Sequence, residues 1–358
     1  MTFGARALIR LGALRHNLSV IRDASPDAKI MAVIKANAYG HGMVTVAQNV
    51  GDVDAFAVAR LPEAIELRDA GIRKPIVLLA GVLTDEEFAA AVEHGFDIVV
   101  HCPEQVELLQ RCNSGSAVVW LKFDTGMNRL GFSPEDSADL IETLQNCPAV
   151  AELRLMSHLA SADDQGNSAT QEQLRQFEAV SKGFSGAVSV ANSAAALGWP
   201  LSAGDCWIRT GIALFGVSPF DGQTGSDLNL EPVMQFEARL IARKPLKKGA
   251  QVGYKGAYTA VSDTMLGIIS AGYGDGYTRH FKTGTPVLIN GRRVPLIGNV
   301  SMDMIAVDLG ATASDTVGDI VTLWGPGLPV EEIAPWAGAI PYELVCGVMN
   351  REASEIVD

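Results

Sequence analysis

Short apolar runs alternate with helical patterns from the start of the chain to about residue 230. The runs are rich in Val, Ile, Leu and Ala, as expected of strands that are buried on both faces. Between them, Thr84–Glu87 has the pattern of a capping box, Gly95 that of a helix stop and Ser133-Pro134 that of a helix start. The expected strands are Ile30–Lys35, Ala55–Arg60, Ile76–Gly81, Asp97–His101, Ala117–Asp124, Leu153–His158, Ala187–Asn192 and Cys206–Arg209.

These eight strand–helix alternations fit a (β/α)8 TIM-like barrel, which typically needs ~250 residues. A doubly wound open sheet is the alternative. The number of strands favours the barrel, and we assign residues 1–230 to it.

After Leu230 the apolar runs are separated by Gly, Asn and Asp. Asn290-Gly291 between two of them is a strong hairpin signal, and Val330–Ala337 is predicted to be one short helix. We therefore expect an α/β protein whose residues 231–358 form a β-rich C-terminal domain. Its expected strands are Met234–Ala242, Met265–Ser270, Pro286–Ile289, Val294–Ile297, Met304–Leu309 and Ile320–Trp324.

Composition excludes several classes of protein. The 358 residues are 48% hydrophobic, which argues against disorder. A net charge of −13 argues against nucleic acid as a partner, because phosphate binding needs clustered Lys and Arg. No apolar run reaches the ~18 residues of a membrane span, and the N-terminal segment has no signal-peptide pattern. Five cysteines without a CxxC pair favour a reducing compartment, so we expect a cytoplasmic protein without a membrane partner. The six histidines show no metal-ligand spacing.

Lys35 ends the first expected barrel strand and so points toward the carboxyl-end mouth, where barrels carry their active sites. Burial disfavours the ammonium form and lowers the pKa of a lysine from ~10.4, which makes the amine a nucleophile. Schiff-base formation is the natural hypothesis, and a structural lysine that extends its amine to solvent is the alternative.

The segment Val33–Gly42, VIKANAYGHG, resembles the cofactor-lysine segment of the alanine racemases, a pyridoxal-phosphate family of fold type III. Eight further segments match that family in order and across both domains, which makes the resemblance specific. They are Leu121–Gly131, Ser157–Asp163, Ala191–Ala196, Arg209–Ile212, Val252–Tyr254, Ala271–Gly276, Val300–Asp303 and Pro341–Glu343.

The resemblance implies pyridoxal 5′-phosphate as the cofactor, attached through Lys35. Ser193, Gly211 and Ile212 follow the last two barrel strands, where barrels commonly bind phosphate. The residues that the resemblance assigns to cofactor binding are Lys35, Tyr39, His158, Asn192, Ser193, Arg209, Gly211, Ile212 and Tyr342.

Arg209 is implied to face the pyridine nitrogen of the cofactor. An arginine stays protonated and donates a hydrogen bond, which leaves that nitrogen unprotonated and the ring a poorer electron sink than opposite a carboxylate. This suppresses transamination. The alternative for Arg209 is an ion-paired structural arginine at the barrel end.

Racemisation needs a proton to leave one face of Cα and another to arrive on the opposite face, so two groups are required. Lys35 and Tyr254 are the implied catalytic pair. A tyrosine ordinarily ionises near pH ~10, and a tyrosine base therefore needs positive neighbours, for which His158 and Arg209 are nominated. In the family the tyrosine comes from the partner subunit, so the resemblance implies a homodimer with shared active sites.

Arg129 and Met302 are implied to bind the substrate carboxylate, Met302 through its backbone N–H and from the partner subunit. Tyr273 and the pair Asp163 and Arg279 resemble the family's narrow substrate entrance. Lys122 matches a lysine that many members carry as a carbamate, which would place a negative group beside Arg129.

Three positions depart from the family. Phe215 replaces a frequent tyrosine, Lys255 directly follows Tyr254, and the tail Asn350–Ala353 lacks the usual Val-Pro after its arginine. None touches a primary chemical role, but substrate breadth and tail packing stay open.

The expected activity is interconversion of L- and D-alanine, which supplies D-alanine for peptidoglycan or degrades it. A broad-specificity amino-acid racemase is the alternative, although such enzymes usually carry an export signal. An amino-acid decarboxylase of this fold would want a carboxylate where Arg209 stands, and a non-catalytic cofactor carrier would be a lone barrel.

Overall fold

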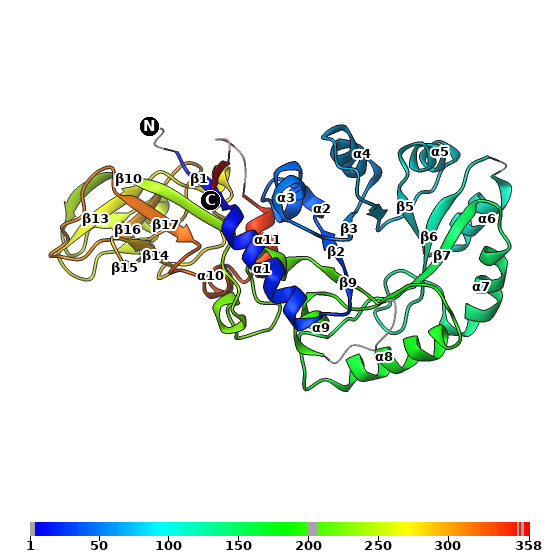
Figure 1. The fold of residues 1–358 in the computed structure, drawn as a ribbon. Coiled ribbons are helices and arrows are strands. Elements are labelled where there is room, and N and C mark those ends of the chain that lie inside the picture. Colours follow the sequence, from blue (N-terminus) through cyan, green and yellow to red (C-terminus); the bar gives the residue numbers. More distant parts are fainter. Residues whose placement is uncertain (1–3, 113, 200–205, 349–350, 352–353) are drawn as a thin grey trace.

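The computed structural model describes residues 4–112, 114–199, 206–348, 351 and 354–358, and it divides into a barrel and a β-rich part (Figure 1). The barrel sheet consists of parallel strands in the order β8-β7-β6-β5-β4-β3-β2-β9. A parallel bridge between Val188 and Cys206 brings β8 beside the start of β9 and nearly closes the barrel. Eight such strands are present in the described residues, so the predicted (β/α)8 barrel is confirmed. The strands are β2 (Lys29–Val33), β3 (Ala55–Val58), β4 (Ile76–Leu78), β5 (Asp97–Val100), β6 (Ala117–Lys122), β7 (Val150–Met156), β8 (Val188–Ser189) and β9 (Trp207–Thr210).

Helices alternate with these strands and cover the outside of the barrel (Figure 1). Residues with the predicted helix-start and helix-stop patterns lie at the ends of these helices. Thr84 Oγ1 accepts a hydrogen bond of 3.2 Å from Glu87 N, and Gly95 ends the same helix at φ 64°. The helices are α1 (Leu11–Ala24), α3 (Met43–Asn49), α4 (Leu61–Asp69), α5 (Asp85–His94), α6 (Pro103–Arg111), α7 (Ser137–Gln145), α8 (Ser168–Ser181) and α9 (Ser193–Gly198).

The β-rich part is a second sheet in the order β15-β14-β17-β10-β1-β18, with β13 and β16 paired beside β10. Asn290 at φ 48° and Gly291 at φ 75° make the predicted tight turn between β14 and β15. The predicted helix α10 (Val330–Ala337) is confirmed, and a second helix, α11 (Pro341–Cys346), follows it. The strands are β10 (Met234–Leu246), β13 (Thr264–Ile269), β14 (Pro286–Ile289), β15 (Arg292–Pro295), β16 (Ile305–Asp308) and β17 (Ile320–Trp324), with a small ribbon of β11 (Gln251–Val252) and β12 (Tyr258–Thr259).

Both ends of the chain contribute to this second sheet. Strand β1 (Arg6–Arg10) pairs antiparallel with β10 and parallel with β18 (Glu355–Val357), so the blue β1 lies among yellow and orange strands in Figure 1. The domain boundary at residue 230 stays a prediction. The second sheet does not follow this boundary, because Arg6–Arg10 precedes residue 230 and yet belongs to that sheet. One continuous cluster of buried apolar side chains runs through both parts, from Ile30 in β2 to Trp324 in β17.

Candidate active site

Lys35 begins a left-handed turn at the carboxyl end of β2. The turn is α2 (Lys35–Tyr39), in which Ala36, Asn37, Ala38 and Tyr39 all have φ near 53°. Left-handed helical backbone costs about 1–2 kcal/mol per non-glycine residue, and runs of such residues are rare. The strand was predicted to extend to Lys35. It ends two residues earlier, at Val33, because the chain leaves the sheet to form this turn.

Side chains from neighbouring segments hold the turn by its backbone. Glu63 Oε1 accepts from Ala36 N at 2.7 Å, and Glu63 Oε2 accepts from Ala59 N at 2.8 Å. Asn37 Oδ1 accepts from Met43 N at 2.8 Å. Each bond satisfies a backbone donor, of the turn at Ala36, of the following helix at Met43, and of the segment after β3 at Ala59. Sequence reasoning missed Glu63, although its place three residues after Arg60 at a helix start is a capping signal.

The Lys35 amine is half-buried. Burial, and after it the positive charge of Arg129, lower the pKa of Lys35 below its ordinary value, while Glu63 opposes them. A lowered pKa increases the neutral fraction of the amine near pH 7, which is the form that attacks a carbonyl and accepts a proton.

Tyr39, Ser193 and Gly211 come together below Lys35. A Cβ atom at Gly211 would lie 2.5 Å from the Tyr39 hydroxyl oxygen, so any larger residue there would displace that hydroxyl. Ser193 Oγ accepts from Gly211 N at 3.0 Å and from Ala213 N at 3.4 Å. Ile212 continues the chain into a short 3-10 helix, η2 (Ile212–Phe215). A tyrosine hydroxyl, a serine hydroxyl and backbone N–H groups converge here, which is the donor set that a phosphate group needs.

Two other predicted cofactor residues border this cradle. Tyr342 extends from α11, and its ring centroid lies 6.2 Å from that of Tyr39. Burial, and then Asp163, raise the pKa of Tyr342 to about 12, so it stays a hydrogen-bond donor at neutral pH. Asn192 serves as the N-cap of α9, because its Oδ1 accepts from Ala195 N at 3.0 Å. Its role at the site is therefore to fix the backbone before Ser193.

Arg209 is buried in the barrel and is held by oxygen acceptors. Its guanidinium donates to Ser189 Oγ at 2.6 Å and to the Ser157 carbonyl at 2.7 Å. No carboxylate forms an ion pair with Arg209 in the described part of the chain, which argues against the structural ion pair considered above. A buried cation without a counter-ion is costly unless a ligand acceptor completes its surroundings.

His158 accepts a hydrogen bond of 3.0 Å at Nδ1 from Arg209. Burial, and then the charge of Arg209, lower the pKa of His158 to about 2. His158 is therefore neutral and cannot be the positive neighbour that we nominated for the catalytic tyrosine. Of the two nominated groups, Arg209 alone carries charge.

Lys122 and Arg129 line a small cavity together with His158. Lys122 is buried, and burial, then Arg209 and Arg129, lower its pKa to about 8. No carboxylate lies within ion-pair distance of its amine in the described residues. Lys122 and Arg129 thus face one cavity, and the carbamate expected on Lys122 stays a prediction.

Asp124 shapes the loop that carries Arg129 and was not among the predicted residues. Its Oδ1 accepts from the N–H groups of Gly126, Met127 and Asn128 at 2.9–3.0 Å, and Oδ2 accepts from Arg129 N at 3.0 Å. Burial alone would raise the pKa of Asp124, but these backbone donors lower it overall. Its position before Thr-Gly is the turn signal that could have identified it.

Tyr254, Met302 and Tyr273, three of the predicted residues of the β-rich part, are exposed on this chain. Tyr254 is 72% exposed at the tip of the β11–β12 ribbon, Met302 53% and Tyr273 40%. No hydrogen bond or ring contact joins Tyr254 to the barrel within the described residues. Lys255 beside it has φ 60° and shapes the ribbon turn. The structure therefore brings together the barrel residues but leaves Tyr254 and Met302 apart from them within one chain.

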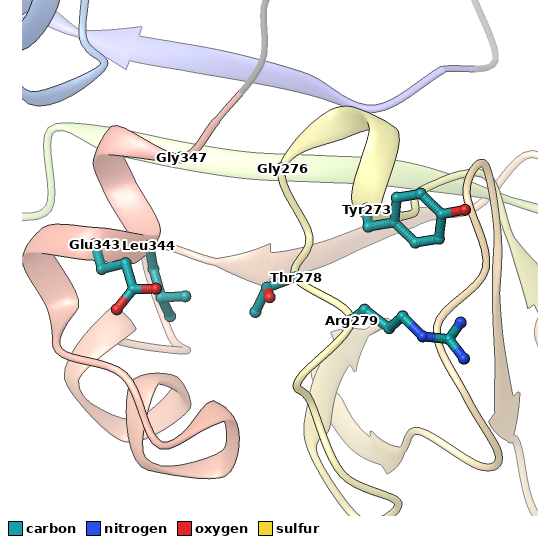
Figure 2. A pocket seen from close by; sticks show the side chains of 7 residues that line it. All are labelled: Tyr273, Gly276, Thr278, Arg279, Glu343, Leu344 and Gly347. Carbon is teal, nitrogen blue, oxygen red and sulfur yellow. The ribbon is translucent and has the colours of Figure 1, made fainter.

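A cavity of about 370 Å³ lies between the Tyr273–Arg279 segment and α11. Arg279 and Thr278 border it on one side, and Glu343 and Leu344 on the other (Figure 2). Asp163 is exposed and forms no ion pair with Arg279 in the described part of this chain. The predicted entrance pair is thus not assembled within one chain.

The family departures have structural counterparts. Phe215 is fully buried against Tyr39, at a centroid distance of 5.2 Å. Arg351 pairs with Asp303 at 2.8 Å and with Asp275 at 3.3 Å. The rest of the tail, Asn350, Glu352 and Ala353, lies outside the described residues.

The described residues contain neither a candidate metal site nor a candidate membrane span. Histidine, cysteine, aspartate and glutamate side chains form no group of three or more that could hold a metal ion. Within the same residues, every helix is too short or too polar to cross a bilayer.

Comparisons with known proteins cover nearly the whole chain. Residues 9–219 match the family model of the alanine racemase N-terminal domain, and residues 233–356 match that of the C-terminal domain. The chain is 49% identical over 350 residues to an alanine racemase of Shewanella woodyi, which covers 97% of this chain and 98% of that protein. An alanine racemase of Vibrio parahaemolyticus is 46% identical over 353 residues, with 98% of each protein covered.

Solved structures agree with these sequence relatives. The biosynthetic alanine racemase from Pseudomonas aeruginosa superposes with a TM-score of 0.96 at 39% identity and full coverage of both chains. The alanine racemase from Acinetobacter baumannii gives a TM-score of 0.93 at 35% identity, over 99% of this chain and 100% of that one.

Proposed function

The chain belongs to the alanine racemase family and interconverts L-alanine and D-alanine, and from this premise we propose that pyridoxal 5′-phosphate binds at Lys35. The observation that carries the cofactor proposal is the buried guanidinium of Arg209, which has no carboxylate counter-ion among the described residues. The Tyr39–Ser193–Gly211 cradle, too narrow for a Cβ at Gly211, supports the same assignment. The residues present therefore fit the group.

The binding residues divide by the part of the cofactor that each suits. Tyr39, Ser193, Tyr342 and the backbone at Gly211 and Ile212 would hold its phosphate. Arg209 would donate a hydrogen bond to its ring nitrogen, and His158 would lie beside the ring as a neutral group. When bound, pyridoxal phosphate withdraws electrons from the Cα–H bond of the amino acid and so makes that proton removable.

The proton transfers are performed by two side chains of the protein. Lys35 Nζ removes or delivers the proton on one face of Cα, which its lowered pKa favours. The Tyr254 hydroxyl oxygen does the same on the opposite face. Arg129 and the backbone N–H of Met302 bind the substrate carboxylate and hold Cα between the two bases.

We further propose a homodimer in which Tyr254 and Met302 of the partner subunit complete each site. Tyr254 is 72% exposed on its own chain. Tyr273 is exposed beside the cavity, and Met302 is exposed on the same β-rich part. Large exposed side chains of this kind mark interaction surfaces. The entrance of Tyr273, Asp163 and Arg279 would likewise form between two chains.

Lys122 is proposed to carry a carbamate. A neutral amine is the form that adds carbon dioxide, and the pKa of about 8 makes that form accessible. The resulting negative charge would hold Arg129, which an ammonium would repel.

A chiral assay with a panel of amino acids tests the reaction, and borohydride reduction tests the cofactor site. We expect L-alanine and D-alanine each to be converted to a racemic mixture, and peptide mapping after reduction should find the pyridoxyl group on Lys35. A purified protein that binds no pyridoxal phosphate would overturn the cofactor proposal. Preferred turnover of larger amino acids would favour the broad-specificity racemase instead.

A further inference from the structure

His41 lies directly beyond the left-handed turn and is almost completely buried, with 1% of its surface exposed. Its Nδ1 lies 2.9 Å from the carbonyl oxygen of Ala38 and 2.9 Å from that of Tyr39. Carbonyl oxygens only accept hydrogen bonds, so Nδ1 must carry the ring proton. Burial lowers the pKa of His41 to about 4, which agrees with a neutral ring.

The other ring nitrogen, Nε2, has no partner among the described residues and lies beside a cavity of about 10 Å³ that Trp324 also lines. Within the described part of the chain, both hydrogen bonds of the imidazole therefore go to the turn.

Aromatic packing connects the same ring to Tyr39 by a second route. The His41 ring stacks on Phe215 at a centroid distance of 4.3 Å, and Phe215 contacts the Tyr39 ring at 5.2 Å. Tyr39 is thus fixed through its carbonyl group by His41 Nδ1 and through its ring by Phe215. Its hydroxyl then reaches the backbone at Gly211.

We propose that His41 is a positioning residue which, through its Nδ1–H, locks the left-handed turn and thereby places the Tyr39 hydroxyl at the cofactor phosphate. The inference rests on the proposed function, because it assumes that the Tyr39–Ser193–Gly211 cradle binds phosphate. His41 itself does not touch the cofactor. Its effect is on phosphate recognition and not on proton transfer.

Asparagine and glutamine at position 41 form a matched pair that tests this. An asparagine amide can place an N–H where Nδ1 stands, whereas a glutamine amide reaches the position of Nε2. We expect His41→Gln to weaken pyridoxal phosphate binding about tenfold, which is ~1.4 kcal/mol and the size of a single hydrogen bond. His41→Asn should recover most of the affinity. Full-length protein, freed of cofactor with hydroxylamine, is titrated and followed by absorbance.

Pyridoxal, which lacks the phosphate, serves as the second probe. His41→Gln should leave pyridoxal binding unchanged, and in a Tyr39→Phe background it should add no further loss. Equal losses for both probes, or glutamine performing as well as asparagine, would overturn the proposal.

Two controls keep the test interpretable. If the wild type itself shows no preference for pyridoxal phosphate over pyridoxal, the phosphate site is wrong, whatever His41 does. If a variant does not fold, ¹⁵N NMR of the wild-type holoenzyme still decides, because six histidines are few enough to assign. A proton on Nδ1 of His41 supports the proposal, and a proton on Nε2 overturns it.

Discussion

Arg209 donates a hydrogen bond of 3.0 Å to Nδ1 of His158, and this contact determines which ring nitrogen of His158 carries the proton. A guanidinium has donors only, so Nδ1 must be the acceptor and Nε2 carries the hydrogen. With the pKa of His158 lowered to about 2, the ring presents a neutral N–H donor. Such a donor can stabilise an ionised tyrosine without adding charge to the site.

We predict that His158 does not titrate between pH 5 and pH 9. The ¹⁵N shifts of its ring should stay those of a neutral Nε2–H imidazole over roughly this range. An unfolded histidine binds a proton below pH 6.5 and the folded His158 does not, so this group makes folding less stable as the pH falls below 6.5. A ring protonated at pH 6 would contradict the assignment.

Tyr254→Phe should keep the cofactor and lose racemisation. Removing one general base costs roughly 10²–10⁴-fold, and folding should tolerate the change because Tyr254 is 72% exposed on its own chain. With L-alanine, exchange of the Cα proton into deuterated water should stall, whereas the absorbance of bound cofactor should be unchanged. Near-normal racemisation by this variant would rule out the two-base scheme.

Lys122→Ala should weaken substrate binding through Arg129. Without the proposed carbamate, Arg129 loses its negative neighbour, and KM for alanine should rise more than kcat falls. Lys122→Glu places a carboxylate in the same cavity and should recover part of the loss. Enzyme prepared with ¹³C-bicarbonate should show a carbamate carbon resonance that Lys122→Ala lacks. If wild type and variant give the same spectrum, Lys122 is unmodified.

The structure also makes a prediction at the opposite, amino-terminal end of the barrel. Asp97 is buried there and contacts the indole N–H of Trp120 and the guanidinium of Arg154, each at 3.3 Å. Burial raises the pKa of Asp97 to about 6, and Arg154 opposes this only in part. The folded protein therefore binds this proton more tightly than the unfolded chain, whose aspartate has a pKa near 3.8.

The contribution of Asp97 to the free energy of unfolding must therefore fall as the pH rises. Between about pH 4 and pH 6 the loss amounts to about 3 kcal/mol, at 1.36 kcal/mol for each pH unit. Urea unfolding of wild type and Asp97→Asn over this range measures it, and the curve of the variant should be flatter by this amount. Asp52→Asn is the control, since Lys74 lowers the pKa of this exposed carboxyl and reverses the sign. Parallel curves for wild type and Asp97→Asn would contradict the raised pKa.

Strand positions could be predicted because the barrel strands are buried on both faces and therefore apolar throughout. Their ends could not, since the apolar run continues to Ile34 although the strand ends at Val33, and the left-handed backbone begins at Ala36. That conformation depends on Glu63 and His41, which tertiary structure brings to the turn. Local propensity alone gives no sign of a left-handed turn in Ala-Asn-Ala-Tyr.

Site residues could be named from motifs, but their electrostatics could not. His158 was expected to be a positive group, and only its burial beside Arg209 reveals a neutral one. Strand β1 was not predicted either, because its pairing also depends on tertiary structure. Arg6–Arg10 alternates in burial like an ordinary strand, and nothing local indicates that its partner is β10, far along the chain.

If the active site is shared between two chains, the activity of mixed dimers depends only on how the subunits pair. Lys35 belongs to the barrel, and Tyr254 is exposed at the tip of a ribbon in the β-rich part. If one site takes Lys35 from one chain and Tyr254 from the other, two inactive variants can complement each other. Lys35→Ala and Tyr254→Phe homodimers should each be nearly inactive.

Co-expression of the two variants creates heterodimers in which one site has both lesions and the other has neither. Random pairing makes heterodimers about half of the population, so roughly a quarter of wild-type activity should return. Mixing the two purified homodimers under conditions that prevent exchange is the control and should return none. If both bases came from one chain, every heterodimer site would carry one lesion. No recovery, with heterodimers verified by mass spectrometry, would therefore rule out the tyrosine of the partner subunit while leaving the cofactor site intact.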